Sequence, residues 1–205
     1  MIHAKRRKSA QRKDKRHDIL RAAVSEFAKK GYNNANINEI AALAEVATGT
    51  IYNYFLNKDD LLIQAMHAMV EDTLRSIKKR IAGEPRAVDK LIRFFYEHVS
   101  VFTANPVIAR FMVVELRQSE EFYKRYPTYN PYNEYLHYIQ ELCRQSIAEE
   151  TTLPYDPVTL SYLIIGFMDM TLTQWVINPD NVNLQSICEE AQQILHFGLA
   201  TDSYR

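Results

Sequence analysis

The sequence predicts an all-α fold, with a head of three helices followed by a larger helical bundle. Its 205 residues contain only five glycines and seven prolines, which leaves long windows without a helix breaker. Apolar residues recur three and four positions apart in these windows, and strand-like alternation is absent. A hydrophobic fraction of 47% suffices to bury a substantial core.

The first helix of the head is expected at about residues 15–30. Ile19, Ala23 and Phe27 recur at helical spacing and define its buried face. Basic residues occupy its last turn and Gly31 follows, which is typical of a helix C-terminus.

Two short helices are expected next, with a tight turn between them. Asn36 and Glu39 have the spacing of a capping box, which opens the second helix. The turn falls at Glu45 and Val46, and a third helix covers about residues 48–54. Such a trio has the helix-turn-helix plan, in which the third helix enters the major groove of DNA.

The body is expected to begin near Lys58, so that residues 1–57 form a DNA-binding domain and 58–205 a ligand-binding and dimerisation domain. Asp59 and Asp60 suit the positive N-terminal end of the first body helix. Gly, Pro or Asn residues bound six predicted helices, at 58–82, 86–104, 106–119, 131–150, 156–178 and 183–199.

The last two helices are predicted to join two subunits. Segment 156–178 is apolar on several faces, and an aspartate within it would cost about 3 kcal/mol in a bilayer, so we expect a buried helix of a soluble protein with no membrane contact. Apolar surface beyond that needed for its own core suits a subunit interface. We therefore predict a homodimer with a four-helix bundle between subunits, through Phe167, Ile187, Ala191 and Ile194.

Charge is divided unequally along the neutral chain. Residues 1–60 hold 12 Lys and Arg against 7 Asp and Glu, so this end should face a polyanion. No apolar segment of a secretory signal follows the basic residues 5–16, and a cytoplasmic protein is expected. The basic run is either a disordered arm or an arm that enters the minor groove. Cys143 and Cys188 fit reduced thiols better than a disulfide or a zinc site.

The head resembles the N-terminal signature of TetR-family regulators. The matching residues are Phe27, Gly31-Tyr32, Asn36–Ala41, Val46, Thr48–Phe55 and Lys58. The resemblance implies a transcriptional regulator whose partner is a double-stranded DNA operator.

The expected DNA contacts combine that resemblance with helical geometry. Ile51 and Phe55 supply apolar anchors, so the polar side chains of the third helix project outward. Gly49 permits close approach to the duplex, and Tyr52 can lie against a thymine methyl group. Tyr54 is more readily a packing residue than a DNA contact, because one side of so short a helix must bury against the other two. The predicted DNA-binding residues are Asn36, Ile37, Thr48, Gly49, Thr50, Tyr52, Asn53, Tyr54 and Lys58.

Two residues depart from the family pattern. Glu45 stands where the family usually has Gly, which predicts a left-handed conformation costing about 1 kcal/mol. Ala47 stands where the family usually has Ser, so the third helix loses a side-chain cap worth about 1 kcal/mol.

Enzyme motifs are missing from the sequence. The five glycines form no GxGxxG or GxxxxGK loop, and no GxSxG elbow occurs. The six histidines include no HExxH pair, so neither a metal nor a cofactor is expected. A DNA-binding regulator is therefore favoured over an enzyme.

Segments of the body resemble the acyl-CoA-responsive repressors of fatty-acid degradation within the TetR family. These segments are Glu115–Ser119 and Phe167–Asn178, and the resemblance implies a fatty acyl-CoA effector. Large apolar side chains suit an acyl chain, and arginines suit the phosphates of coenzyme A. The predicted ligand-binding residues are Phe102, Ile108, Arg110, Phe111, Met112, Arg117, Met168, Leu172 and Trp175.

Several alternatives stay open at this point. The apolar residues could form ordinary core, and Arg117 could pair with Glu115 or Glu121. The tyrosines at 123–138 could cover the end of the bundle, as a loop that leads into a helix. The same fold could sense a drug or another lipophilic ligand, or serve as a helical interaction protein without DNA.

Overall fold

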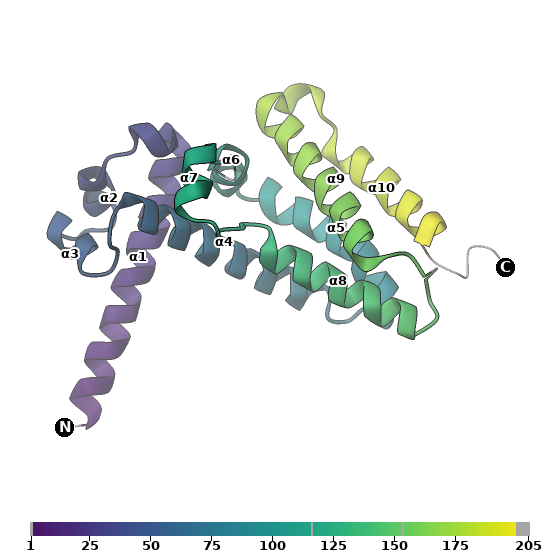
Figure 1. Ribbon diagram of the computed structural model, residues 1–205, viewed down its shortest axis with the longest axis horizontal. Coiled ribbons are helices and arrows are strands. Elements are labelled where there is room, and N and C mark those ends of the chain that lie inside the picture. The colour runs from purple at the N-terminus through teal and green to yellow at the C-terminus, as the bar shows by residue number, and fades with distance from the viewer. Residues whose placement is uncertain (1, 116, 153, 200–205) are drawn as a thin grey trace. The chain divides into compact units, whose positions relative to one another are not determined.

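A computed structural model describes residues 2–115, 117–152 and 154–199 (Figure 1). Among these residues, every secondary-structure element of three or more residues is a helix, as the sequence predicted. The chain forms two compact units, which we call the head unit and the body unit. The head unit combines the chain up to Met69 with Arg110–Tyr129, and the body unit combines Val70–Ala109 with the chain from Asn130 onward.

The head unit holds the predicted three helices and more. Its helices are α1 (Ile2–Asn34), α2 (Ile37–Leu43), α3 (Thr48–Tyr52), the first half of α4 (Lys58–Ile81), most of α6 (Pro106–Glu115) and α7 (Glu120–Arg125). Its fully buried large side chains include Phe27, Ile40, Phe55, Phe111 and Phe122. Residues 58–69 and 110–129 therefore pack within the head unit. The predicted boundary between a DNA-binding domain, 1–57, and a ligand-binding domain, 58–205, concerns function and stays a prediction.

Helix α1 is longer than predicted, since it begins at Ile2 instead of near residue 15. Neither Gly nor Pro occurs before Gly31, so the chain offers no helix breaker in this region. Gly31 has a φ of 74° and interrupts the helical backbone there, close to the predicted end.

A second difference concerns the predicted helix 106–119, which ends earlier than expected. Helix α6 ends at Glu115, and α7 begins at Glu120. The Ser119 hydroxyl accepts a hydrogen bond from the Phe122 N–H (3.2 Å) and caps α7, whose first turn is acidic. Helix α7 lies in a stretch that the sequence assigned to a loop.

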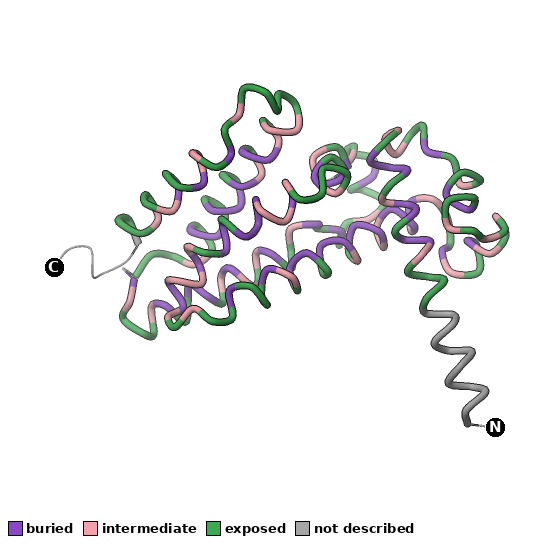
Figure 2. Tube along the Cα trace, turned by 180° about the vertical axis from the view of Figure 1, so that it is seen from behind, coloured by how far each residue is buried: buried purple, intermediate pink, exposed green. Residues whose placement is uncertain are grey.

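The body unit contains the second half of α4 with four further α-helices. These are α5 (Ala87–Thr103), α8 (Asn133–Ala148), α9 (Pro157–Ile177) and α10 (Leu184–Leu199), with a short 3-10 helix η1 (Pro179–Asn181) between the last two. Helix α8 packs against α5 and α9, and α10 packs against α5. The buried residues form stripes along these helices (Figure 2). Each predicted boundary of α5, α8, α9 and α10 lies within two residues of the observed one.

Helix α9 is only partly buried within the single chain. It is the one helix in the described ranges whose length and hydropathy would suffice to cross a membrane, and about a third of its apolar window is buried. It packs against α5, α8 and α10. Its exposed side chains include Tyr162, Leu163 and Met170.

Candidate nucleic-acid interface

The start of α2 is fixed by the predicted cap. The side chain of Asn36 accepts a hydrogen bond from the backbone N–H of Asn38 at 2.9 Å. The Glu39 carboxylate, which a full capping box would direct back to Asn36, pairs instead with Lys30 of α1 at 2.5 Å. Helices α1 and α2 are therefore joined by an ion pair at the surface of the head.

The turn after α2 confirms what Glu45 and Ala47 predicted, a left-handed residue and a helix without a side-chain cap. Glu45 has a φ of 54°, and its N–H donates to Ala42 while that of Val46 donates to Ala41. This is a Schellman motif, in which Gly usually holds the left-handed position. Ala47 occupies the N-cap of α3 and provides no side-chain hydrogen bond. The helix-turn-helix geometry thus forms with a strained turn and an uncapped third helix.

Helix α3 buries one side and exposes the other. Ile51 and Phe55 are almost completely buried, as predicted for the anchors, whereas Tyr52 is 55% exposed. A Cβ atom at Gly49 would meet no atom within 4 Å, so the outer surface of the helix is open there. Asn53 is exposed too, and Thr50 is half-buried. An open row of small and polar groups beside one aromatic ring suits the major groove.

The other predicted DNA contacts are more enclosed. The Thr48 hydroxyl donates to the Asn38 side chain at 2.9 Å and joins α3 to α2. Ile37 is half-buried, and Tyr54 is half-buried with its ring centroid 6.3 Å from that of Phe55. Helix α3 ends at Tyr52, two residues before the predicted end.

Lys58 begins α4 and packs against the end of α1. Its Nζ lies 4.7 Å from the centroid of the Tyr32 ring and donates to the Asn33 carbonyl at 3.3 Å. Partial burial lowers the pKa of its ammonium group from the ordinary value. Lys58 therefore already has partners within the head unit.

A carboxylate that the sequence predicted only as an acidic residue at a helix start lies buried next to Lys58. Asp59 is 7% exposed and accepts hydrogen bonds from the Tyr32 hydroxyl, from Arg125 at 2.8 Å and from the Tyr126 hydroxyl at 3.0 Å. We call these four residues the Asp59 cluster. It ties the end of α1 and the start of α4 to α7.

A second buried carboxylate also bonds to Tyr32. Glu115, at the end of α6, accepts hydrogen bonds from the backbone N–H of Tyr32 at 2.8 Å and from the Gln118 side chain at 3.1 Å. Burial raises the pKa of its carboxyl group. In the sequence, Asp59 was noted only as an acidic residue at a helix start, which usually marks a solvated position. Glu115 was noted only within a segment that resembles the acyl-CoA-responsive repressors and as a possible partner of Arg117. None of these signals indicated a buried carboxylate.

The predicted ligand-binding residues are divided between the two units. In the body unit Phe102, Met168 and Leu172 are buried, and Ile108 and Trp175 are half-buried. In the head unit Phe111 and Met112 are buried, with Phe111 stacked on Phe27 at 6.4 Å. Arg110 and Arg117 are exposed, and the Arg110 Nε donates to the Ala28 carbonyl at 2.8 Å.

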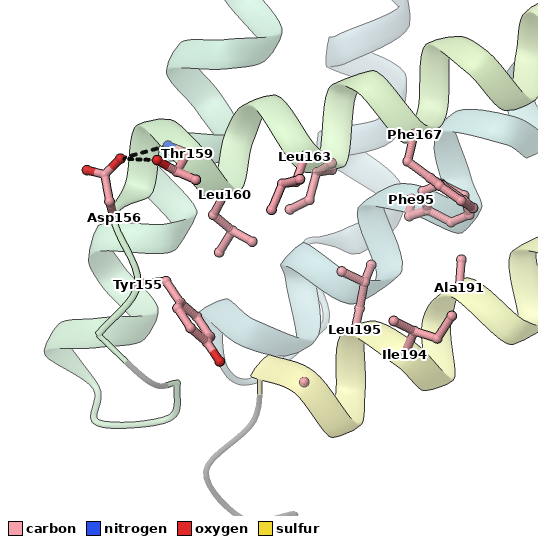
Figure 3. A pocket seen from close by; sticks show the side chains of 12 residues that line it. Phe95, Tyr155, Asp156, Thr159, Leu160, Leu163, Phe167, Ala191, Ile194 and Leu195 are labelled. Atoms are coloured by element: carbon pink, nitrogen blue, oxygen red, sulfur yellow. Dashed lines mark hydrogen bonds between the residues drawn. The ribbon is translucent and has the colours of Figure 1, made fainter.

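Three of the predicted dimerisation residues, Phe167, Ala191 and Ile194, line an apolar groove of about 460 Å³ between α9 and α10, whereas Ile187 is not part of its lining (Figure 3). Phe167 is 46% exposed and Ile194 is 69% exposed, while Ile187 is half-buried and Ala191 is buried. Figure 3 shows Leu163 of α9 opposite Leu195 of α10, and Phe167 of α9 against Phe95 of α5, with 5.4 Å between the two ring centroids.

The two cysteines are free and buried. Burial raises the pKa of both thiols to about 11, so they are protonated at neutral pH. This agrees with the expected reduced thiols, which are inert because the thiolate is the reactive form.

Two family models match the chain in succession. Residues 19–65 match bacterial regulatory proteins of the tetR family. Residues 64–198 match the C-terminal region of YsiA-like proteins. The second match covers more than half of the chain, and together the two span both the head helices and the body.

Known proteins match over nearly the whole length. The fatty acid metabolism regulator protein of Bacillus subtilis (strain 168) is 28% identical over 190 residues, which is 92% of this chain and 97% of the relative. The fatty acid degradation regulator FadR of Bacillus halodurans superposes with a TM-score of 0.78 at 28% identity, covering 87% of this chain and 96% of that one. FadR of Bacillus subtilis in complex with stearoyl-CoA gives a TM-score of 0.76 at 28% identity and the same coverage.

Proposed function

Because the chain belongs to the TetR family of bacterial regulatory proteins, we propose that it is a repressor released from a palindromic operator by a long-chain acyl-CoA. The family and the relatives are DNA-binding transcriptional regulators and not enzymes, and so is this chain. Because regulators of this kind act on DNA in bacteria, the proposed location is the cytoplasm.

The outer surface of α3 carries the DNA-binding part of the proposal. More than half of the Tyr52 side chain is exposed. At nearby Gly49, an added Cβ atom would meet no other atom within 4 Å. An exposed aromatic ring on the third helix of a helix-turn-helix suits a base edge rather than the protein core. We therefore propose that Thr50, Tyr52 and Asn53 contact bases. The other predicted residues are proposed to support these three or to contact the DNA backbone; they are Asn36, Ile37, Thr48, Gly49, Tyr54 and Lys58.

The proposed subunit interface is the groove between α9 and α10. Its rim exposes Leu163, Phe167 and Ile194, three large apolar side chains on two adjacent helices. A surface of this kind suits a second copy of the same chain, because an isologous interface buries it on both subunits. Ile187 and Ala191 would lie in the same four-helix bundle.

The proposed effector is a long-chain acyl-CoA. The Bacillus subtilis structure with stearoyl-CoA supports this, as do buried Phe102, Met168 and Leu172 in the body unit. Ile108, Phe111, Met112 and Trp175 are proposed to complete the apolar lining. Exposed Arg110 and Arg117 have the charge and planar shape to pair with the coenzyme A phosphates.

A titration against the protein–operator complex tests the effector. Palmitoyl-CoA, free palmitate and coenzyme A are added separately, and the bound fraction of a fluorescent operator is measured. We expect release by palmitoyl-CoA alone. Equal release by palmitate would remove the role of the arginines, and release only by a hydrophobic drug would make the chain a sensor of other lipophilic ligands.

DNA binding is tested with Tyr52→Ala, which should abolish specific binding without unfolding the protein because the side chain is exposed. Leu43→Ala, at an equally exposed apolar residue of α2, is the matched control and should keep operator affinity within about twofold. Wild-type affinity should fall steeply with salt, since phosphate contacts release counterions. A flat salt response would contradict the proposal and favour a helical interaction protein.

A further inference from the structure

An imidazole and a phenol lie together in the aromatic core of the body unit. His98 of α5 and Tyr135 of α8 are 5% and 3% exposed, and their ring centroids are 5.4 Å apart at an interplanar angle of 88°. Phe94 packs on both rings, at 6.5 Å from His98 and 5.8 Å from Tyr135. We call His98 and Tyr135 the His98–Tyr135 pair.

Both members of the pair have unused hydrogen-bonding capacity. The His98 Nδ1 and the Tyr135 hydroxyl are fully enclosed, and no group in the described residues forms a hydrogen bond with either atom. Buried polar groups without a partner destabilise a fold, and few are found in native proteins. Two such atoms in one aromatic cluster therefore point to a partner that is not part of the folded chain.

The surroundings restrict the charge of that partner. The rings within reach of His98 are those of Phe94, Phe102 and Tyr135, and none of them carries a charge. Burial also lowers the pKa of His98 to about 3, so the imidazole is neutral and offers no positive charge to an anion. A buried carboxylate without a cation is strongly disfavoured, whereas an uncharged carbonyl accepts two hydrogen bonds at little cost.

We propose that the His98–Tyr135 pair binds the uncharged carbonyl of the effector, which in an acyl-CoA is the thioester carbonyl. The inference rests on the proposed function and adds the residues that would recognise the thioester. The Tyr135 hydroxyl donates one hydrogen bond, and the His98 Nδ1–H donates the other. Phe102, a predicted ligand residue, lies 4.6 Å from the His98 ring and provides the adjoining apolar surface.

The pair also explains how a site could prefer a thioester to a free fatty acid. A free fatty acid carries a negative charge on the oxygens of the carboxylate that replaces the thioester carbonyl. Since the enclosing groups are neutral, the acid would have to lose its charge or leave it unpaired on binding. Discrimination would therefore arise at the carbonyl, in addition to any contacts with the coenzyme A phosphates.

The test compares palmitoyl-CoA with S-hexadecyl-coenzyme A, a thioether that has a similar chain and no carbonyl. Binding to the full-length protein is measured by calorimetry for wild type, Tyr135→Phe and His98→Phe. Wild type should bind palmitoyl-CoA about tenfold more tightly than the thioether. Each variant should lose about threefold in affinity for palmitoyl-CoA, because two hydrogen bonds share the tenfold preference, and should lose none for the thioether.

Tyr138→Phe is the matched control. Tyr138 also lies against Phe94, at 5.7 Å, but Lys78 covers its ring at 4.1 Å and it stands outside the pair. The affinities of Tyr138→Phe for palmitoyl-CoA and for the thioether should equal those of wild type. Urea unfolding of every variant without ligand checks that Tyr135→Phe is at least as stable as wild type.

The outcomes separate this inference from the proposed function. Equal wild-type affinity for both compounds, or an unchanged preference in Tyr135→Phe, would overturn the carbonyl site and leave the acyl-CoA effector standing. No wild-type binding of either compound would overturn the effector and the carbonyl site together. Equal losses in Tyr135→Phe and Tyr138→Phe would also refute the specific role of the pair.

Discussion

The Asp59 cluster of the head unit and the His98–Tyr135 pair of the body unit both bury polar groups, but the two sites differ in their partners. Asp59 accepts hydrogen bonds from three side chains on α1 and α7. The two enclosed atoms of the His98–Tyr135 pair receive none from the described residues. Both sites use tyrosine hydroxyls, so the contrast lies in the arrangement and not in the residue types.

This difference distinguishes a group that holds the fold from a group that is available to a ligand. A satisfied buried carboxylate fixes the helices that supply its donors, because moving any of them leaves a charge unpaired. An unsatisfied pair destabilises the empty protein and can regain that free energy on binding. The Asp59 cluster therefore positions α1, α4 and α7, and the His98–Tyr135 pair is suited to recognition.

The largest expected effect is the loss of the central acceptor in the head. Asp59→Ala leaves two hydroxyls and Arg125 without their acceptor and should lower the free energy of unfolding by about 3 kcal/mol. Urea denaturation followed by circular dichroism measures it. Asp59→Asn, which keeps an acceptor oxygen, should lose less. A loss below about 1 kcal/mol would show that the cluster is not a structural centre.

His98 in the body unit and Glu115 in the head unit should respond to pH with opposite signs. His98 has a folded pKa of about 3 against an ordinary value of 6.5, so its contribution is fully present above pH 6.5 and is lost as the pH falls toward 3. Between pH 7 and 5 the loss should be about 2 kcal/mol. Glu115 has a raised folded pKa, so its contribution is fully present below its ordinary value of 4.5 and is lost as the pH rises through the folded value.

Urea unfolding at a series of pH values, on wild type, His98→Phe and Glu115→Gln, separates the two contributions. His98→Phe should be less sensitive to acid than wild type. Glu115→Gln should lack the decline in stability as the pH rises above 4.5. Parallel pH profiles for all three proteins would contradict both assignments.

A matched pair of tyrosine substitutions sharpens the contrast directly. Tyr126→Phe removes one donor from Asp59 and should destabilise the protein by about 1 kcal/mol. Tyr135→Phe removes a hydroxyl that has no partner among the described residues, so the stability should stay the same or rise. Differential scanning calorimetry without ligand measures both. Equal losses would mean that Tyr135 has a structural partner after all.

The smallest effect provides a control that is common to both units. Glu45 and Glu150 have φ values of 54° and 57°, and each holds the left-handed position of a Schellman motif. Replacing either with Gly should stabilise the protein by about 0.5 kcal/mol, because Gly adopts this conformation without strain. Thermal unfolding of the two variants should show similar gains. A large difference between them would indicate that the units respond unequally to any substitution.

Much of the head could be predicted from the sequence because its signals are local. Asn36 caps α2 through an atom two residues away, and the turn at Glu45 is fixed by the end of the same helix. The burial of Ile51 and Phe55 follows from the period of a helix. The early start of α1 at Ile2 was missed, because the basic run 5–16 was interpreted as an arm and lacks the apolar periodicity of a buried helix.

The sequence by itself determined the all-α class, the helices of the body and the helix-turn-helix, since periodicity, caps and breakers act over a few residues. Only the tertiary structure decided which polar groups have partners. Asp59 meets Arg125 across 66 positions, and His98 meets Tyr135 on a different helix. Hydrogen bonding and burial over such separations depend on how helices pack, and no local pattern records them. Arg110 was predicted as a ligand residue from its charge. Its hydrogen bond to the Ala28 carbonyl could not be predicted, for the same reason.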